Sequence, residues 1–216
     1  MRFKTHRKFN MASGKYIVFE GGEGAGKDTC LARLREEFGD KNFVYTREPG
    51  GTELGKALRN MLLHNSHGEI KLPTELLLFL ADRAQHVEEL IKPALASSKH
   101  VISNRSWISF LAYQIHGRRQ YDWEPVVVEF LKKIFDGYPT DLAIVLDVPY
   151  EVGHERMVKM GKLFDTIESM PKTSHERIRQ AFLTLAKDLP QARVIDASRP
   201  LEAVWKDVKA AVQSVI

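Results

Sequence analysis

The sequence predicts an α/β fold in three layers, with a five-stranded parallel sheet between two layers of helices. Five short apolar runs lack the polar alternation of a half-exposed strand, which is typical of parallel strands covered on both faces. They span 16–20, 42–46, 100–103, 142–148 and 192–195. Helical patterns separate these runs, and such alternation favours an open sheet with right-handed crossovers. Ligands of such sheets bind at the carboxyl ends of the strands.

Two amphipathic helical patterns occupy the C-terminal part of the chain. Apolar residues at steps of three and four form one stripe over 201–215, and the same spacing recurs over 178–189. Thr173 and Glu176 have the T-x-x-E spacing of a capping box, in which each side chain satisfies a backbone donor of the first helical turn. We therefore expect helices over both stretches, with a capping box at the start of the earlier one.

A long helix is also expected over 73–91, ended by Pro93 because proline lacks the backbone donor that a helix interior needs. Within this helix, the apolar face over 76–80 is compatible with a homodimer contact. The longest unbroken apolar run, 76–81, is far shorter than the roughly 20 residues of a membrane span, so no such span is predicted.

The composition is typical of a globular protein with a sizeable core. The chain has 216 residues, of which 44% are hydrophobic and 28% charged, and its mean hydropathy is −0.28. This length predicts one domain, over 15–216, after a basic extension at 1–14. Residues 1–10 lack the apolar stretch of a secretory signal. They are interpreted as a disordered extension, as sequence upstream of a start at Met11 or, less favoured, as a transit peptide.

The net charge of +4 is concentrated at the beginning of the chain. Five basic residues and no acidic residue precede Glu20, so the remainder carries a net charge near −1. That balance argues against a broad nucleic-acid-binding surface. Cys30 is the single cysteine, which excludes an intrachain disulfide and favours a reduced, cytoplasmic compartment.

A glycine-rich segment follows the first predicted strand and precedes a helical pattern. It has the spacing G-x-x-x-x-G-K and comprises Gly21, Gly22, Glu23, Gly24, Ala25, Gly26 and Lys27. Glycines let backbone N–H groups converge on phosphate oxygens, and the helix N-terminus behind them adds partial positive charge. Lys27 can reach the β- and γ-phosphates. A glycine-rich turn that merely contains a lysine is the alternative, but the strand-loop-helix context favours an ATP-binding P-loop.

The residue after the lysine departs from the P-loop pattern. A Ser or Thr is expected there, because its hydroxyl binds Mg²⁺, but this chain has Asp28 followed by Thr29. A carboxylate beside a triphosphate is repulsive, since two unit charges 4 Å apart repel by about 4 kcal/mol at an effective dielectric of 20. Asp28 therefore either coordinates Mg²⁺ directly, or points away, or impairs ATP binding.

Five sequence blocks resemble those of one known family, and they occur in the same order. They are FEGGEGAGKDT at 19–29, TREPGGT at 46–52, FLADRAQHV at 79–87, NRSWISFLAYQ at 104–114 and LDVP at 146–149. The family is thymidylate kinase, the dTMP kinase of dTTP synthesis, and TREPGG together with the ADRAQH block makes the resemblance specific. It implies a P-loop kinase fold with a short lid around 157–172, ATP and Mg²⁺ as cofactors, and a homodimer.

The resemblance also assigns roles to residues outside the P-loop. Arg47 would bind the phosphate of dTMP, a task that suits a planar guanidinium, and Arg105 would hold phosphate between donor and acceptor. With Lys27, these residues would carry the phosphoryl transfer. Phe79 and Arg83, four residues apart, share one helix face. They would stack on thymine and hydrogen-bond its edge.

Four further residues complete the implied acceptor site. Ser109 and Gln114 would line the base pocket, Tyr113 would crowd the ribose 2′ position, and Glu23 would meet the 3′-hydroxyl. Simpler alternatives stay open for several residues. Phe79 could belong to the core and Arg83 could be a surface ion-pair partner. Tyr113 could be ordinary packing, and the turn with Arg47 and Glu48 could be solvated.

The chain departs from the family pattern near the expected chemistry. Asn104 replaces the aspartate of an Asp-Arg pair that normally helps place the metal, while Asp28 adds a carboxylate nearby. We hypothesise that the metal-holding carboxylate has moved into the P-loop. On the acceptor side, Phe110 stands where a smaller polar residue usually faces the base.

The lid also lacks an arginine. Its D-R-x-E pattern reads Asp165, Thr166, Ile167 and Glu168, and Met160 occupies a second place where arginine is common. Arg156, Lys159 and Lys162 are the nearby cationic substitutes. Because an arginine at the transferring phosphoryl group can be worth about 10³ to 10⁵ in turnover, we expect a slow enzyme rather than an inactive one.

Three functional interpretations follow. The leading one is an ATP-dependent dTMP kinase. The second is a nucleotide-binding module of the same fold that has lost catalysis, and the third is a related nucleotide kinase with altered base choice.

Overall fold

The computed structural model describes residues 14–64, 68–161 and 165–216. All five strands run parallel in one sheet, in the order β2-β3-β1-β4-β5. They are β1 (Tyr16–Glu20), β2 (Phe43–Arg47), β3 (His100–Asn104), β4 (Leu142–Asp147) and β5 (Ala192–Asp196). The predicted α/β class and five-stranded parallel sheet are confirmed, and each strand end lies within one residue of its expected place.

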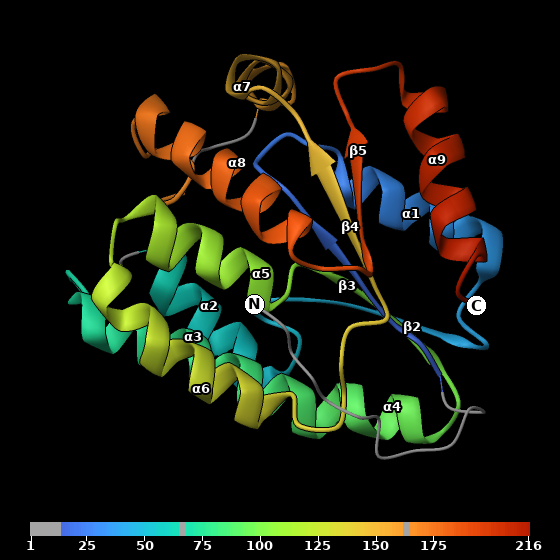
Figure 1. Ribbon diagram of the computed structural model, residues 1–216, viewed down its shortest axis with the longest axis horizontal. Helices are drawn as coiled ribbons and strands as arrows, with labels where there is room; N and C mark the ends of the chain where they lie inside the picture. Colours follow the sequence, from blue (N-terminus) through green and yellow to red (C-terminus); the bar gives the residue numbers. More distant parts are fainter. Residues whose placement is uncertain (1–13, 65–67, 162–164) are drawn as a thin grey trace.

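Helices cover the sheet from two sides, which gives three layers (Figure 1). One side carries α1 (Lys27–Phe38) and α9 (Leu201–Gln213). The other carries α3 (Leu72–His86), the π-helical η1 (Val87–Ile91), α4 (Lys92–Ala96), α5 (Trp107–Phe110), the π-helical η2 (Leu111–Gly117), the 3₁₀-helical η3 (Tyr121–Trp123), α6 (Glu124–Ile134) and α8 (Lys172–Lys187). Next to α3 lies α2 (Glu53–His64), and α7 (Tyr150–Lys159) follows β4.

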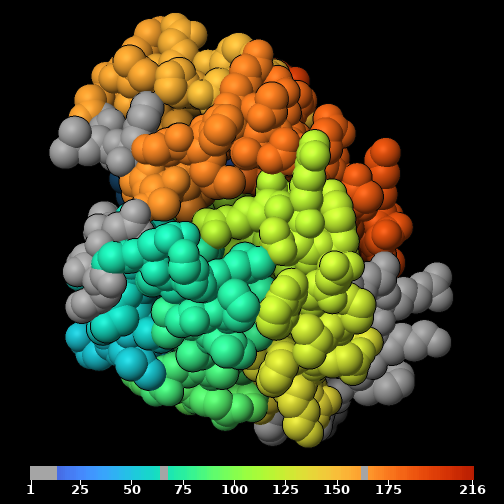
Figure 2. Space-filling model, turned by 90° about the vertical axis from the view of Figure 1, so that its left-hand side faces the viewer, coloured from blue at the N-terminus to red at the C-terminus, as the bar shows by residue number. Residues whose placement is uncertain are grey.

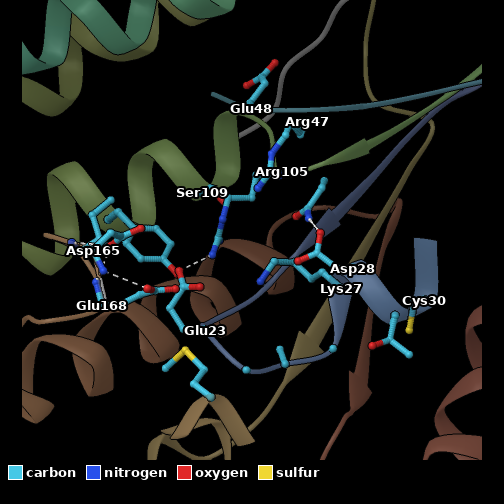
Figure 3. Close-up of a pocket in the computed structure, with 18 of the residues that line it drawn as sticks. Glu23, Lys27, Asp28, Cys30, Arg47, Glu48, Arg105, Ser109, Asp165 and Glu168 are labelled. Carbon is cyan, nitrogen blue, oxygen red and sulfur yellow. Dashed lines mark hydrogen bonds and ion pairs between the residues drawn. The ribbon is translucent and has the colours of Figure 1, made fainter. Parts of the chain in front are cut away.

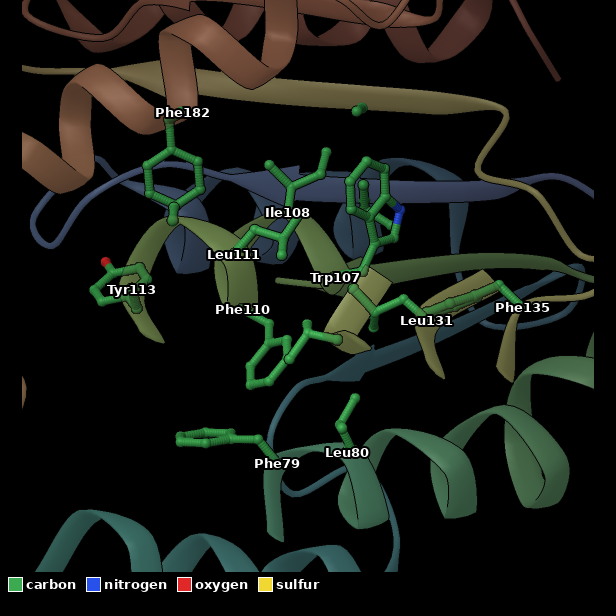
Figure 4. Close-up of a cluster of buried hydrophobic side chains, with 14 of the residues drawn as sticks. Phe79, Leu80, Trp107, Ile108, Phe110, Leu111, Tyr113, Leu131, Phe135 and Phe182 are labelled. Carbon is green, nitrogen blue, oxygen red and sulfur yellow. The ribbon is translucent and has the colours of Figure 1, made fainter. Parts of the chain in front are cut away.

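Successive residues of β1 point into two different hydrophobic cores. Tyr16 and Val18 belong to the core that includes residues of α3, α5, α6 and α8, part of which Figure 4 shows. Ile17 and Phe19 belong to the core formed with α1 and α9. All four side chains are fully buried. Because both faces of the strand are covered, its sequence shows no polar alternation.

The edge strand β5 is less covered than predicted. Val194 is 49% exposed, and most of the strand is open to solvent. Its apolar run predicted the strand correctly but did not reveal that it lies at the edge of the sheet, where β4 is its neighbour among the described strands.

The helix predicted over 73–91 continues past its expected end, so the assignment of Pro93 as its stop is wrong. The chain changes to a π-helical turn at η1 and then to α4, in which Pro93 lies in the first turn. There the backbone N–H of Lys92 bonds to the carbonyl of Val87, five residues earlier. Proline is tolerated in a first helical turn because no intrahelical partner is needed for its missing N–H.

The predicted capping box is also wrong. Helix α8 begins at Lys172 after Pro171, and no side chain of the described residues caps its N-terminus. Instead, the backbone N–H of Ser174 donates to the carbonyl of Pro171 at 2.8 Å. Thr173 and Glu176 lie inside the helix, because Pro171 with φ −57° already directs the chain into it.

Two predicted regions fall partly outside the described residues. Of the extension at 1–14, only Gly14 is described. Within the expected lid, Lys162 lies outside the described residues, and a turn from Asp165 leads to α8. No helix among the described residues combines the length and apolar character that crossing a membrane would require.

Candidate functional site

A cavity of about 520 Å³ opens at the carboxyl ends of β1, β2 and β3. It is lined by most of the predicted site residues, namely Glu23, Gly24, Ala25, Gly26, Lys27, Asp28, Thr29, Arg47, Phe79, Arg83, Arg105, Ser109, Tyr113 and Gln114. The predicted residues Gly21 and Gly22 are not among its lining. Figure 3 shows Lys27 and Asp28 on one side of the cavity and the lid residues Asp165 and Glu168 on another.

The P-loop geometry requires glycine at several positions, of which Gly24 and Gly26 lie at the cavity. Gly26 is the N-cap of α1 and has φ +88°, a left-handed conformation that L side chains rarely adopt. At Gly24, with φ +68°, a Cβ atom would lie 2.1 Å from the carbonyl oxygen of Gly153 in α7. The loop therefore passes directly against α7, and its backbone stays close to the cavity.

Lys27 folds back over the loop that carries it. Its Nζ donates to the carbonyls of Gly21 at 2.9 Å and Gly22 at 2.8 Å. Burial, with a smaller contribution from Arg105, lowers the pKa of Lys27 from 10.5 to about 7. A bound phosphate would favour the protonated form, so this lysine is suited to respond to an anionic ligand.

Arg105 lies where the P-loop meets the rest of the cavity. Its backbone has φ +74°, and its Nη1 donates to the carbonyl of Gly21 at 2.9 Å and to Ser109 Oγ at 3.1 Å. Its Nη2 pairs with Glu23, which also accepts from the Tyr113 hydroxyl at 2.9 Å. Although burial works in the opposite direction, the Glu23 carboxylate raises the pKa of Arg105. The guanidinium is thus held in one place and charged.

Two further arginines lie near the end of β2. Arg47 is the exposed last residue of that strand. Arg59 of α2 donates from Nη1 to the carbonyl of Pro49 at 3.0 Å, and burial together with the charge of Arg47 lowers its pKa. Both line the cavity. Cations held this close together favour an anionic ligand between them.

Arg83 is held by a buried ion pair rather than at the surface. It is 3% exposed, and its Nε donates to Glu48 Oε2 at 2.7 Å. The other oxygen of Glu48 is 2.9 Å from His86 Nδ1. Although burial alone would raise it, Arg83 and His86 hold the pKa of Glu48 below its usual value. Within the part of the chain that the structure describes, Arg83 Nη1 is buried and has no hydrogen-bond partner, so it remains available to a ligand.

Two simpler alternatives, a surface ion pair for Arg83 and a solvated turn at Arg47 and Glu48, are therefore wrong in part. Arg83 is an ion-pair partner, as the alternative expected, but it is buried with Glu48 instead of lying at the surface. Glu48 is only 1% exposed, so the turn that follows Arg47 is not solvated at this position.

Aromatic rings form the wall beside Arg83. The ring of Phe79 lies 6.0 Å from that of Phe110, and Arg83 Cζ is 5.1 Å from the centre of the Phe110 ring. Phe79 belongs to the hydrophobic core and also lines the cavity, so the two alternatives stated for it are compatible. Tyr113 likewise packs edge-on against Phe182 while its hydroxyl reaches Glu23. Figure 4 shows Phe79 and Phe110 facing each other.

Asp28 lines the cavity rather than pointing away from it. Its Oδ1 accepts a hydrogen bond of 2.7 Å from Asn104 Nδ2 (Figure 3). Asp28 on α1 and Asn104 on β3, two of the departures from the family pattern, are therefore in direct contact.

The cationic side chains beside the lid contact the P-loop backbone or a neighbouring carboxylate. Arg156 lines the cavity and donates to the carbonyl of Gly24 at 3.4 Å. Lys159 also lines it but pairs with Glu155 at 2.6 Å. Thr166 turns towards α2, where its hydroxyl donates to the carbonyl of Leu63 at 3.0 Å.

Sequence reasoning missed several residues of the cavity. Arg59 gave no signal, because it is a single arginine on an amphipathic helix. Ala197, Arg199 and Leu201 follow the carboxyl end of β5 and line the cavity near the P-loop. The rule that ligands bind at strand carboxyl ends could have identified these three.

Comparison with known proteins gives consistent results over nearly the whole chain. The thymidylate kinase family model matches residues 19–208. The thymidylate kinase of Pelotomaculum thermopropionicum is 41% identical over 210 residues, 94% of each chain, and that of Protochlamydia amoebophila is 43% identical over 187 residues, 82% of each. The crystal structure of thymidylate kinase from Ehrlichia chaffeensis has a TM-score of 0.72 and 32% identity, and the match covers 93% of this chain and 99% of that one.

Proposed function

This chain belongs to the thymidylate kinase family and phosphorylates dTMP to dTDP, and we propose that the residues lining the cavity carry out the transfer from ATP. The family and the reaction predicted from the sequence motifs are thereby confirmed. The assignment of individual residues is the proposal, and it is supported by the geometry of the cavity.

One observation carries the proposal. Lys27 of the P-loop and Arg105 at the end of β3 donate to the same carbonyl oxygen, that of Gly21, each at 2.9 Å. A cation suited to the donor phosphates and a cation suited to the acceptor phosphate therefore meet at one point. Phosphoryl transfer depends on such positioning and on neutralising charge, because the protein takes little part in covalent chemistry.

On the donor side, the P-loop N–H groups and Lys27 hold the triphosphate of ATP. The residues after β5, including Arg199 and Leu201, lie where the adenosine would bind. Arg105 stands between the two nucleotides and stabilises the charge of the transferring group.

On the acceptor side, Arg47 and Arg59 bind the phosphate of dTMP, and Phe79 and Phe110 enclose its base. The free Nη1 of Arg83 donates to a carbonyl on the thymine edge, while Ser109 and Gln114 complete the pocket. Tyr113 fills the space beside the ribose, where a 2′-hydroxyl would clash, and Glu23 accepts from the 3′-hydroxyl.

The residues present fit a magnesium ion carried by the nucleotide. Mg²⁺ in kinases is held by one or two carboxylates together with substrate phosphates. Asp28 supplies such a carboxylate in the P-loop, with its Oδ1 fixed by Asn104. When bound, Mg²⁺ would neutralise charge on the phosphates of ATP.

We expect slow transfer, because Thr166 stands where the family pattern has a lid arginine. Of the nearby cations, Arg156 contacts the P-loop carbonyl of Gly24 and Lys159 is paired with Glu155. Neither is held towards the point where Lys27 and Arg105 meet.

A cytoplasmic homodimer is also proposed. The face over 76–80 contributes little, because Leu76, Phe79 and Leu80 are buried within the protein and Leu77 alone is largely exposed, at 57%. Val126 and Phe130 of α6 are also exposed, and α6 packs beside α3 (Figure 2). These apolar side chains give a second copy a surface to cover.

A coupled assay of ADP release tests the function directly. We expect release that depends on both ATP and dTMP, and little release without dTMP. Binding of both nucleotides without transfer would instead support the nucleotide-binding module that has lost catalysis.

A thermal-shift series with dTMP, dUMP, dCMP and dGMP tests base choice. The Arg83 donor requires a carbonyl at the base edge, whereas cytosine presents an amino group there. Leaving a buried donor unsatisfied costs about 1–3 kcal/mol, so dCMP should bind roughly 5- to 150-fold more weakly than dTMP. A larger shift with dCMP or dGMP would indicate altered base choice.

A further inference from the structure

The contact between Asp28 and Asn104 joins the two departures from the family pattern at the expected metal position. The bond of 2.7 Å runs from Asn104 Nδ2 to Asp28 Oδ1, and both residues line the cavity. A carboxylate only accepts hydrogen bonds, so the amide nitrogen of Asn104 must face it. The amide orientation is therefore determined by Asp28.

This orientation leaves another group unsatisfied. Asn104 is 5% exposed, and its Oδ1 is buried with no hydrogen-bond partner among the described residues. An unpaired buried carbonyl is destabilising, because it gives up its hydrogen bonds to water and gains none in return. Folding alone gives no reason to keep Asn104 in this state, which points to a role in holding Asp28.

The charge at position 28 also determines which residue fits at position 104, and the reverse holds as well. If an aspartate stood at position 104, two carboxylates would lie in contact, and their like charges would repel each other. If a threonine stood at position 28, Asn104 would lose the acceptor that orients it. Asp28 is thus suited to an asparagine at position 104 rather than to an aspartate. Asn104 is suited to an aspartate at position 28 rather than to a threonine.

We infer that Asn104 is a positioning residue for Asp28, which replaces the β3 carboxylate as the protein's ligand to nucleotide-bound Mg²⁺. The amide holds Oδ1 and leaves Oδ2 for the metal or for a water bound to it. This inference rests on the proposed function, because it requires a nucleotide in the P-loop. It predicts that the carboxylate can be moved back to β3 when both positions are exchanged together.

The test measures the affinity for ADP by calorimetry, with Mg²⁺ and with EDTA, so that the ratio isolates the contribution of the metal. Removal of a metal-supporting residue typically lowers metal affinity 10- to 100-fold. We expect the Mg²⁺ enhancement to fall at least about tenfold in Asp28→Thr and to return to within about threefold of wild type in Asp28→Thr/Asn104→Asp. In Asn104→Asp, unfolding without Mg²⁺ should occur at a lower temperature, and Mg²⁺ should reverse much of that loss.

An isosteric variant separates the metal role from folding. Asp28→Asn keeps the size of the side chain, so its unfolding temperature should stay near that of wild type while the Mg²⁺ enhancement falls. An unchanged enhancement in Asp28→Thr or Asp28→Asn would overturn the inference, as would a double variant whose Mg²⁺ enhancement is no larger than that of Asp28→Thr. dTMP affinity should remain unchanged in all variants. If wild type binds neither ADP nor dTMP, the residue assignments of the proposed function fail instead.

Discussion

The acceptor side and the donor side of the cavity are built differently. On the acceptor side, Glu48, Arg83 and His86 are almost fully buried and depend on one another through an ion pair and a hydrogen bond. On the donor side, Asp28 is exposed, accepts a hydrogen bond from Asn104 and lies near the charge of Lys27. Departures from the family pattern collect on the donor and lid side, with Phe110 the exception. A group with few buried partners can be exchanged by changing one neighbour, whereas a buried network would have to change as a whole.

The largest effect is expected at Arg105, where the two sides meet. Arg105→Met removes the cation between donor and acceptor and should lower kcat about 10³-fold. The affinity for ATP should change little, because Lys27 and the P-loop remain. Steady-state kinetics measure both quantities. Arg193→Met, an exposed change on β5, is the matched control, and a similar loss in that variant would show that the effect is not local.

The next largest effect concerns the buried acceptor network. Glu48→Gln leaves Arg83 and His86 without their carboxylate and should lower the free energy of unfolding by about 3–5 kcal/mol. It should also raise the KM for dTMP, because Arg83 loses its orientation. Chemical denaturation measures the stability, and Glu53→Gln, whose carboxylate pairs with Lys56 at the surface, should change it by under about 1 kcal/mol. Equal effects in the two variants would show that the buried Glu48 network stabilises the protein no more than a surface ion pair does.

A gain of activity is expected on the lid side. Thr166→Arg restores a cation to the lid and should raise kcat about tenfold, which corresponds to about 1.4 kcal/mol of transition-state stabilisation. The variant loses the hydrogen bond to Leu63, so part of the potential gain is offset. The KM for dTMP should not change. An unaltered or lower kcat would show that the absent arginine does not limit the rate.

The smallest effect is a dependence on pH. Burial lowers the pKa of Lys27 to about 7 in the absence of nucleotide, and phosphate favours the protonated form, so ATP binding takes up a proton above pH 7. ATP affinity should therefore fall as pH rises from 7, by less than about tenfold per pH unit. The unfolded chain keeps this proton up to about pH 10.5, so the contribution of Lys27 to the stability of the nucleotide-free protein should rise with pH over the same interval.

Calorimetry at several pH values measures this dependence. Lys27→Arg is the control, because a guanidinium stays protonated throughout. If the variant and wild type show the same pH profile, the proton uptake does not belong to Lys27.

The sequence predicted the parts of the molecule that repeat a local pattern. The strand β1 was predicted from an apolar run and the P-loop from its glycine spacing. The site residues of the acceptor side were predicted from the resemblance to the thymidylate kinase family. Contacts between distant segments could not be predicted. The resemblance placed Asp28 and Asn104 near one metal position, but neither their hydrogen bond nor the contact of Arg59 with Pro49 could be predicted, because both depend on how the elements pack.

Errors in helix ends have the same origin. Pro93 is a sound local stop signal, but the π-helical turn before it removes the conflict with the helix. The turn that positions Thr166 is held by Leu63, about a hundred residues earlier in the chain. Local helix propensity predicts neither the π-helical turn before Pro93 nor the contact between Thr166 and Leu63.

The central claim is that ATP and dTMP bind at adjoining ends of one cavity, with Lys27 and Arg105 at their junction. Calorimetry with an adenosine and a thymidine joined through a chain of five phosphates tests it most directly. Because one molecule would then occupy both ends, we predict binding at least about a hundredfold tighter than that of ATP or dTMP alone, as expected when two sites are linked at suitable spacing. Binding no tighter than that of the better single nucleotide would contradict the account.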